Sequence, residues 1–149
     1  MNARVYLAGP ILHESDGGAN EWRRDADEYL ARNHILGISP LRNERPHGPK
    51  YDFQSLEGGG PNAIPAKNYF DVLNCDLTLA YLPKWSAGTL LEIGWAKAHA
   101  RPVVLVTQDP IFMKHPVLQW CCGWHYETLK EGLAAVVGLL SGYVGGKNV

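Results

Sequence analysis

The chain has 149 residues and a mass of 16.5 kDa, the size of a single domain that buries roughly 68–70% of its unfolded surface. Hydrophobic residues make up 46% of the sequence and charged residues 19%, with 16 glycines and 10 prolines, so the composition excludes a disordered or low-complexity chain. The formal net charge is −1 and the basic residues form no long run, which argues against a nucleic-acid polymer or an anionic membrane as a partner.

The N-terminal sequence and the cysteines indicate in which cellular compartment the protein is expected. The chain lacks a basic region leading into an apolar segment and a cleavage site, and the apolar stretch over residues 133–144 is too short and too rich in glycine to cross a bilayer. Cys75, Cys121 and Cys122 are odd in number and two of them are adjacent, which predicts neither a disulfide framework nor a spaced metal site. We therefore expect a cytoplasmic protein with reduced, packed thiols, organised as one domain over residues 1–149.

The first part of the chain predicts a strand, a helix and a second strand. Residues 4–8 form a short apolar run closed by a Gly-Pro pair, which is typical of a buried strand. After a loop over residues 11–19, apolar residues recur at helical spacing from Asn20, the expected N-cap of an amphipathic helix. Residues 34–39 predict the second strand, so this part of the chain is one crossover unit.

A long loop is expected next, over residues 41–65, because prolines and glycines interrupt any periodicity there. A helix face follows, formed by Ala66, Tyr69, Phe70 and Leu73. Residues 76–82 and 103–106 predict two further strands, and between them residues 89–100 predict a buried helix that is apolar on nearly every side.

The last part of the chain predicts a proline-bracketed loop, a short strand and a closing helix. The loop, residues 111–120, is rich in apolar residues but has no amphipathic pattern. Residues 124–126 predict the strand. The closing helix has an apolar stripe made of Leu129, Leu133, Val136, Val137 and Leu140.

Strands that alternate with helices predict an α/β fold: a single-domain, doubly wound, flavodoxin- or Rossmann-like parallel sheet of about five strands with helices on both faces. Ligands of such folds bind beyond the carboxyl ends of the strands, where the strand order reverses. The loops after Ala8 and after Leu82 are therefore the expected location of the functional site.

The segment after the third strand, residues 83–94, allows two interpretations. Thr89 and Glu92 have the spacing of a capping box, in which Glu92 would only satisfy a backbone N–H. Alternatively, Glu92 lies one turn into a helix that faces the ligand crevice, with Ser86, Gly88 and backbone N–H groups near a helix start that can bind an anion. A carboxylate in that position can act as a nucleophile.

An ordered set of motifs covers nearly the whole chain. They are Tyr6-Leu7-Ala8-Gly9-Pro10, Ser39-Pro40, Arg42-Asn43, Asp76, Ser86-x-Gly88-Thr89-x-x-Glu92-Ile93-Gly94-x-Ala96 and His115-Pro116. Together they resemble the nucleoside 2-deoxyribosyltransferase family and its relatives that hydrolyse nucleoside 5'-monophosphates.

The resemblance implies a covalent glycosyl-enzyme mechanism that needs no cofactor. Glu92 would attack the anomeric carbon and expel the nucleobase, and the hydroxyl of Tyr6 would orient Glu92. Without the resemblance, Tyr6 is equally well explained as a buried aromatic residue whose hydroxyl is bonded locally. The candidate substrate-binding residues are Gly9, Asn68, Asp71, Ser86, Gly88 and His115.

Two positions depart from the family pattern. Asn68 stands where the family usually has an aspartate, and an amide cannot act as an acid or base. Asp71, one turn later, could substitute, although a solvated helix residue is the simpler interpretation. Ser86 stands where transferases acting on free nucleosides commonly carry an acid that holds the 5'-hydroxyl, and where the related monophosphate glycosidases carry serine, so a 5'-phosphate is expected to improve the substrate.

Other candidate residues are expected to have structural roles. The glycine clusters at residues 17–18 and 58–60 lack phosphate-loop patterns and indicate turns. The histidines lack a metal-binding spacing, so we expect no metal site. Arg23 and Arg24 are expected on a helix surface, although one of them could reach the crevice. Three tryptophans are expected in the core, namely Trp85, Trp120 and Trp124.

The sequence thus predicts an enzyme that breaks the N-glycosidic bond of a 2'-deoxynucleoside or its 5'-monophosphate and passes the sugar to another base or to water. Alternatives are a strictly hydrolytic monophosphate N-glycosidase and a non-catalytic nucleotide-binding module. The resemblance also implies a homo-oligomer, a dimer or larger, in which residues 111–120 of one subunit, with His115, complete the site of a neighbour. The alternative is that this segment folds back onto its own core.

Overall fold

The computed structural model describes residues 2–11, 16–42, 44–45, 48–49 and 58–145. Its centre is a five-stranded parallel sheet in the order β2-β1-β5-β6-β7. The strands are β1 (Arg4–Ala8), β2 (Leu36–Ile38), β5 (Leu77–Tyr81), β6 (Val103–Val106) and β7 (Trp124–Tyr126). This flavodoxin-like order confirms the predicted fold class, and its switch point lies between β1 and β5.

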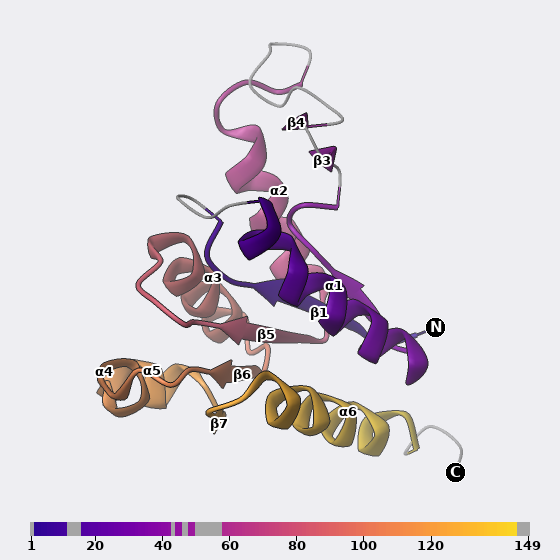
Figure 1. Ribbon diagram of the computed structural model, residues 1–149, viewed down its shortest axis with the longest axis vertical. Coiled ribbons are helices and arrows are strands. Elements are labelled where there is room, and N and C mark those ends of the chain that lie inside the picture. Colours follow the sequence, from indigo (N-terminus) through magenta and orange to yellow (C-terminus); the bar gives the residue numbers. More distant parts are fainter. Residues whose placement is uncertain (1, 12–15, 43, 46–47, 50–57, 146–149) are drawn as a thin grey trace.

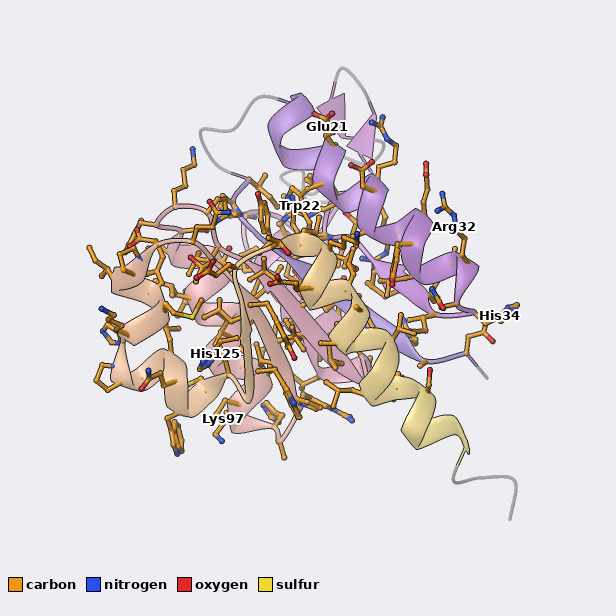
Figure 2. The ribbon with its side chains drawn as sticks, turned by 60° about the horizontal axis from the view of Figure 1, so that its bottom comes forward. Glu21, Trp22, Arg32, His34, Lys97 and His125 are labelled. Atoms are coloured by element: carbon orange, nitrogen blue, oxygen red, sulfur yellow. The ribbon has the colours of Figure 1, made fainter. Side chains whose placement is uncertain are left out.

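Helices cover both faces of the sheet. The helices are α1 (Asp16–Arg32), α2 (Ala63–Asn74), α3 (Ala87–Ala98), α4 (Pro110–Lys114), α5 (Pro116–Cys121) and α6 (Leu129–Gly145). Figure 2 shows α1, in purple, and α6, in yellow, side by side on one face of the sheet. The opposite face packs against α2 and α3, with buried side chains of α4 and α5 in the same core.

Side chains of β1 alternate between these two cores. Val5 and Leu7 pack with residues of α1 and α6. Tyr6 and Ala8 pack on the other face, with residues of α2 and α3. Because successive strand residues point to opposite faces, this alternation directs the Tyr6 side chain toward α3.

Three stretches differ from the sequence prediction. Helix α1 begins at Asp16 rather than Asn20, so residues 17–18 are helical and not a turn. The predicted loop over residues 41–65 contains an antiparallel pair, β3 (Glu44–Arg45) and β4 (Gly48–Pro49), which lies at the top of Figure 1, and its last residues belong to α2. The predicted loop over residues 111–120 forms most of α4 and α5, each of which has a proline in its first turn.

The burial of several aromatic and apolar residues also differs from the prediction. Helix α3 is not buried on every side, because Leu91 is 58% exposed, and Phe70 of α2 is 60% exposed. The three tryptophans expected in the core are exposed instead, at 68% for Trp85, 70% for Trp120 and 37% for Trp124. Helical spacing reports which residues share a face, but not whether a second layer covers that face.

The cysteines are packed to different degrees. Cys75 and Cys122 are buried, Cys121 is partly buried, and all three are free thiols. Burial raises the pKa of Cys75 and of Cys122 to about 12, so both are neutral thiols. Among the described residues, no helix is long and apolar enough to span a membrane.

Candidate active site

A tyrosine and a glutamate meet at the switch point of the sheet. The hydroxyl of Tyr6 on β1 donates a hydrogen bond of 2.8 Å to Oε1 of Glu92 on α3. Tyr6 is 0% exposed and Glu92 is 6% exposed. In the described part of the chain this is the one hydrogen bond of the Glu92 carboxylate, so its second oxygen, Oε2, is available to a substrate.

The surroundings of this pair set its protonation. Burial raises the pKa of Glu92 to about 7, against the opposing effects of the Tyr6 hydrogen bond and the positive charges of Arg23 and Lys67. Burial raises the pKa of Tyr6 as well, and the negative charge of Glu92 adds to that increase. Tyr6 is therefore a permanent donor, whereas Glu92 changes its charge near neutral pH.

Ser86 caps helix α3. Its Oγ accepts hydrogen bonds from the backbone N–H of Thr89, at 3.3 Å, and from Oγ1 of Thr89, at 2.9 Å. Thr89 therefore occupies the third helical position and is not the N-cap, so the capping-box interpretation of Glu92 is wrong. Glu92 lies about one turn further along the helix, where its carboxylate bonds to a side chain of the sheet and not to the helix backbone.

A hollow of about 410 Å³ lies beside this pair. It brings together most of the predicted site residues, because Gly9, Asn68, Ser86 and Gly88 line it together with Glu92. These residues come from the loop after β1, from α2 and from the start of α3. Apolar side chains of the hollow's wall include Ile11, Ile64 and Trp85. This location agrees with the prediction of a site at the carboxyl ends of β1 and β5.

Asp71 has a different role from either interpretation of the sequence. Its side chain is buried, and its carboxylate accepts a bidentate pair of hydrogen bonds from Arg42, at 2.7 and 2.8 Å. Nζ of Lys67 lies 3.4 Å from the same carboxylate. Asp71 is therefore not a solvated helix residue, and it does not line the hollow with Glu92; it ties α2 to the turn after β2. Asn43, which follows Arg42 in the motif, lies outside the described residues.

Lys67 also determines how Asn68 is oriented. Nζ of Lys67 donates a hydrogen bond of 3.2 Å to Oδ1 of Asn68. An ammonium group can only donate, so the amide oxygen must face Lys67, which leaves the NH₂ group for other partners. Asn68 lines the hollow and can therefore present a donor to a substrate, where an aspartate would present an acceptor.

His115 lies away from this hollow. It is the residue between α4 and α5, and it lines a second hollow of about 410 Å³ with Trp85, Ile93 and Phe112. Nζ of Lys97 on α3 lies 4.4 Å from the ring centroid of Trp120 on α5, which holds α5 beside α3; Figure 2 labels Lys97. Trp85 lines both hollows, so the two are neighbours on the surface.

The sequence analysis misplaced Arg23. This side chain is 2% exposed and donates hydrogen bonds to the carbonyl oxygens of Leu7, Gly9 and Ala19. Its neighbour Arg24 is exposed, as predicted. The helical spacing carried a signal for this, because Arg23 shares a face with the buried Ala19, Ala26 and Leu30, whereas Arg24 does not.

Trp22 and Gly9 are in close contact beside Arg23. A Cβ atom placed on Gly9 would lie 2.5 Å from Cζ2 of Trp22, which is inside van der Waals contact, so only glycine fits this wall of the hollow. In the described part of the chain, no group of three His, Cys, Asp or Glu side chains could hold a metal ion.

These features define an α/β protein with a carboxylate-centred site at the switch point of a flavodoxin-like sheet. The family model described as nucleoside 2-deoxyribosyltransferase matches residues 5–135. The chain therefore belongs to the nucleoside 2-deoxyribosyltransferase family, as the motifs indicated.

Solved structures support the fold. A 2-deoxyribosyltransferase from Bacillus psychrosaccharolyticus has a TM-score of 0.67 at 20% identity, covering 87% of this chain and 89% of that one. The Clostridium botulinum CMP N-glycosidase BcmB has a TM-score of 0.57 at 24% identity, covering 89% and 97%. The molybdenum cofactor binding protein from Rippkaea orientalis has a TM-score of 0.62 at 14% identity, covering 94% and 98%. No curated protein sequence matches the chain significantly.

Proposed function

We propose that the protein is an enzyme that cleaves the N-glycosidic bond of a 2'-deoxynucleoside or its 5'-monophosphate, with Glu92 as the nucleophile. The observation that carries this proposal is the buried Tyr6–Glu92 hydrogen bond of 2.8 Å beside a hollow of about 410 Å³. Membership of the nucleoside 2-deoxyribosyltransferase family supports the reaction class. The 2-deoxyribosyltransferase and the CMP N-glycosidase with the same fold supply the two outcomes, transfer and hydrolysis.

In the first step, an oxygen of the Glu92 carboxylate attacks the anomeric carbon. The bond between this carbon and the base nitrogen breaks, and the base leaves with the bonding electron pair and takes up a proton from solvent. Tyr6 holds Oε1 of Glu92, so Oε2 is the attacking atom. A carboxylate is suited to this step because the transition state at the sugar carries positive charge.

In the second step, water or the nitrogen of another base attacks the same carbon and releases Glu92. With water the products are the sugar, or its 5-phosphate, and a proton; with a base the attacking nitrogen gives up its proton to solvent and the product is a new nucleoside or nucleotide. The two outcomes share the Glu92 intermediate and differ only in the acceptor, so water exclusion from the hollow decides between them.

The start of α3 favours a 5'-phosphate on the substrate. Both hydrogen bonds between Ser86 and Thr89 use Oγ of Ser86 as the acceptor, so the Ser86 hydroxyl proton is available to an anion in the hollow. Backbone N–H groups at a helix start also attract anions, and Gly88 lines the hollow there without a side chain. A carboxylate at this position would repel a phosphate, whereas a serine can bind it.

The alternative from another class is a nucleotide-binding module without catalysis. The molybdenum cofactor binding protein has the same fold, so the fold alone is compatible with binding. In such a module Glu92 would need a structural role, and the helix cap that could have supplied one belongs to Ser86. The hydrogen bond of Glu92 to Tyr6, in place of a role in the helix cap, therefore favours the catalytic proposal over the binding module.

The test is incubation of the protein with a panel of nucleosides and 5'-monophosphates, with and without an added free base, followed by chromatography. We expect released base, or exchanged base when an acceptor is added. Glu92→Gln should lose activity by many orders of magnitude because the nucleophile is gone. Glu131→Gln changes an exposed glutamate in the first turn of α6 and serves as the control. A folded Glu92→Gln protein with near-wild-type turnover would falsify the mechanism, and nucleotide binding without cleavage would favour the module.

We also propose that the protein forms a homo-oligomer. The apolar residues of the segment 111–120 differ in burial. Phe112 and Leu118 are buried in the core of their own chain. Ile111 and Val117 line the second hollow and are 71% and 58% exposed, and Trp120 on α5 is 70% exposed. Exposed apolar side chains gathered around a hollow are typical of an interaction surface, and this surface adjoins the Glu92 hollow through Trp85.

A further inference from the structure

Arg23 is a buried cation that the proposed reaction does not yet use. It belongs to α1, which packs on the face of the sheet opposite to Glu92. Its side chain nevertheless reaches the end of β1, where it donates to the carbonyl oxygens of Leu7, at 3.2 Å, and of Gly9, at 2.8 Å. A third donor bonds to the carbonyl of Ala19 in α1.

These hydrogen bonds fall where β1 loses a neighbouring strand. The pairing of β1 with β2 ends at Tyr6, opposite Ile38, whereas its pairing with β5 continues to Ala8. Beyond Tyr6, the guanidinium of Arg23 supplies N–H donors to the backbone of β1 and of the loop that follows. A planar group with five donors in a fixed geometry is suited to holding several carbonyl groups at once.

Arg23 and Trp22 together set the position of Gly9. The guanidinium carbon lies 4.6 Å from the ring centroid of Trp22, and Trp22 leaves no room for a side chain on Gly9. Gly9 lines the hollow and is three residues from Tyr6. A movement of the Arg23 side chain would therefore move both the wall of the hollow and the strand that carries Tyr6.

The charge of Arg23 also acts on the catalytic pair. It lowers the pKa of Glu92 and that of Tyr6, although burial dominates in both cases. The other groups that act on Glu92 are Tyr6 on β1 and Lys67 on α2. Arg23 therefore favours the ionised carboxylate from the α1 side, in a buried region where charges are weakly screened.

We propose that Arg23 is a positioning residue: its guanidinium fixes the backbone that carries Tyr6 and Gly9, and through Tyr6 it holds the Glu92 carboxylate in place. This inference rests on the proposed role of Glu92 as the nucleophile.

The test compares three variants. Arg23→Met removes the positive charge and all the N–H donors. Arg23→Lys keeps the charge but lacks the planar set of donors that can bond to several carbonyl groups. Arg24→Met changes the exposed neighbour and is the matched control. The Glu92 carboxyl is titrated by carbon-13 NMR, with Glu92→Gln to assign its signal, and kcat and KM are measured across pH on the best substrate of the panel. Thermal unfolding shows that each variant is folded.

For Arg23→Met we expect the Glu92 titration and the acidic limb of kcat/KM to move to higher pH, on the order of one pH unit. For Arg23→Lys we expect the titration to stay near that of the wild type while kcat falls about tenfold or more, because the backbone is no longer held. Arg24→Met should match the wild type in every measurement.

The proposal is overturned if folded Arg23→Met titrates like Arg24→Met and retains its kcat. If Arg23→Met does not fold, Arg23→Lys decides: wild-type kcat and KM in that variant contradict the positioning role. The NMR titration requires no turnover. Inactivity of the wild type on the whole panel would therefore contradict the proposed function while the action of Arg23 on Glu92 is still measured.

Discussion

At the scale of single residues, the main feature is that Glu92 is held by a tyrosine and not by an arginine. A direct ion pair would lower the pKa of the carboxyl strongly and make the carboxylate a weaker nucleophile. The Tyr6 hydroxyl fixes one oxygen at 2.8 Å without cancelling the charge. The more distant Arg23 and Lys67 only moderate the effect of burial, which raises the pKa to about 7.

The raised pKa of Glu92 has a consequence for stability. The pKa of about 7 in the folded protein exceeds the ordinary value of 4.5, so the folded state binds more protons than the unfolded state between these values. The contribution of this group is fully present below pH 4.5 and is lost as the pH rises to 7. Glu92→Gln, which cannot ionise and keeps an acceptor for Tyr6, should therefore become more stable than the wild type as pH rises, by roughly 3 kcal/mol at pH 8.

Urea unfolding of both proteins from pH 5 to pH 8 measures this difference. At pH 5 the two free energies of unfolding should be close, and Glu131→Gln should follow the wild type at every pH. A difference between Glu92→Gln and the wild type that stays constant with pH would show that Glu92 ionises as easily in the folded protein as in the unfolded chain.

The sequence analysis identified most residues of the candidate site but not all of their surroundings. Glu92, Tyr6, Ser86, Gly88 and Gly9 were recognisable because they belong to short motifs in a fixed order. The burial of Arg23 and the pairing of Asp71 depend on which elements pack together in three dimensions. Arg23 does share the helix face of the buried Ala19, Ala26 and Leu30, but its carbonyl partners at the end of β1 and the Arg42 partner of Asp71 have no local pattern in the sequence.

At the scale of elements, the cap of α3 links helix stability to substrate choice. Ser86→Asp should preserve the helix, because aspartate is as good an N-cap as serine. The added carboxylate would face a 5'-phosphate in the hollow, so the preference for a monophosphate over its nucleoside should fall about tenfold or more. The ratio of kcat/KM values for the two substrates measures this effect.

Ser86→Ala serves as the comparison for that variant. It should destabilise the protein by about 1 kcal/mol, because the cap is lost, while adding no charge to the hollow. If Ser86→Asp leaves the ratio of the two substrates unchanged, the 5' end of the substrate does not lie at the start of α3.

The packing of α6 on the sheet gives a prediction about two glycines of the same helix. A Cβ atom on Gly132 would overlap Cγ2 of Val106 on β6, whereas nothing lies within 4 Å of a Cβ atom on Gly138. Gly132→Ala should therefore destabilise the protein by about 1–3 kcal/mol through overpacking. Gly138→Ala should stabilise it by about 0.5–1 kcal/mol, because alanine favours a helix.

Denaturant unfolding of the two variants under the same conditions tests this contrast. A Gly132→Ala protein as stable as Gly138→Ala would show that α6 can shift away from β6 at no cost.

The elements themselves were predictable to differing degrees. Strand β6 has the predicted bounds because its four apolar residues follow a proline and are buried on both sides. The start of α1 was missed because Gly17 and Gly18 are poor helix formers, yet both belong to the helix. Residues 110–121 contain two short helices, and the packing of α5 against α3 is a tertiary contact that their own sequence pattern does not show.

At the scale of the whole molecule, the proposed assembly predicts complementation between inactive subunits. Glu92→Ala removes the nucleophile, and a second variant, His115→Ala, alters the segment proposed to complete a neighbour's site. In a dimer mixed at equal amounts with subunit exchange, about one quarter of all sites would be intact. The activity of the mixture should therefore exceed that of either variant alone.

Sedimentation of the wild type is the direct measurement of its assembly. A fully active monomer would contradict the shared site, and so would an oligomer whose mixture of inactive subunits gains no activity after exchange. Trp120→Ser, which removes an exposed apolar side chain of α5, should weaken the association.

The short edges of the sheet constrain how two copies can meet. The outermost strands, β2 and β7, have only three residues each, and they flank a sheet whose longest strands have five. Edges of this length present few unpaired backbone groups, so they are poor templates for the strand-to-strand growth that leads to aggregation. We therefore expect little tendency for the sheet to extend from one molecule to the next, and we expect the proposed homo-oligomer to form through helix and loop surfaces.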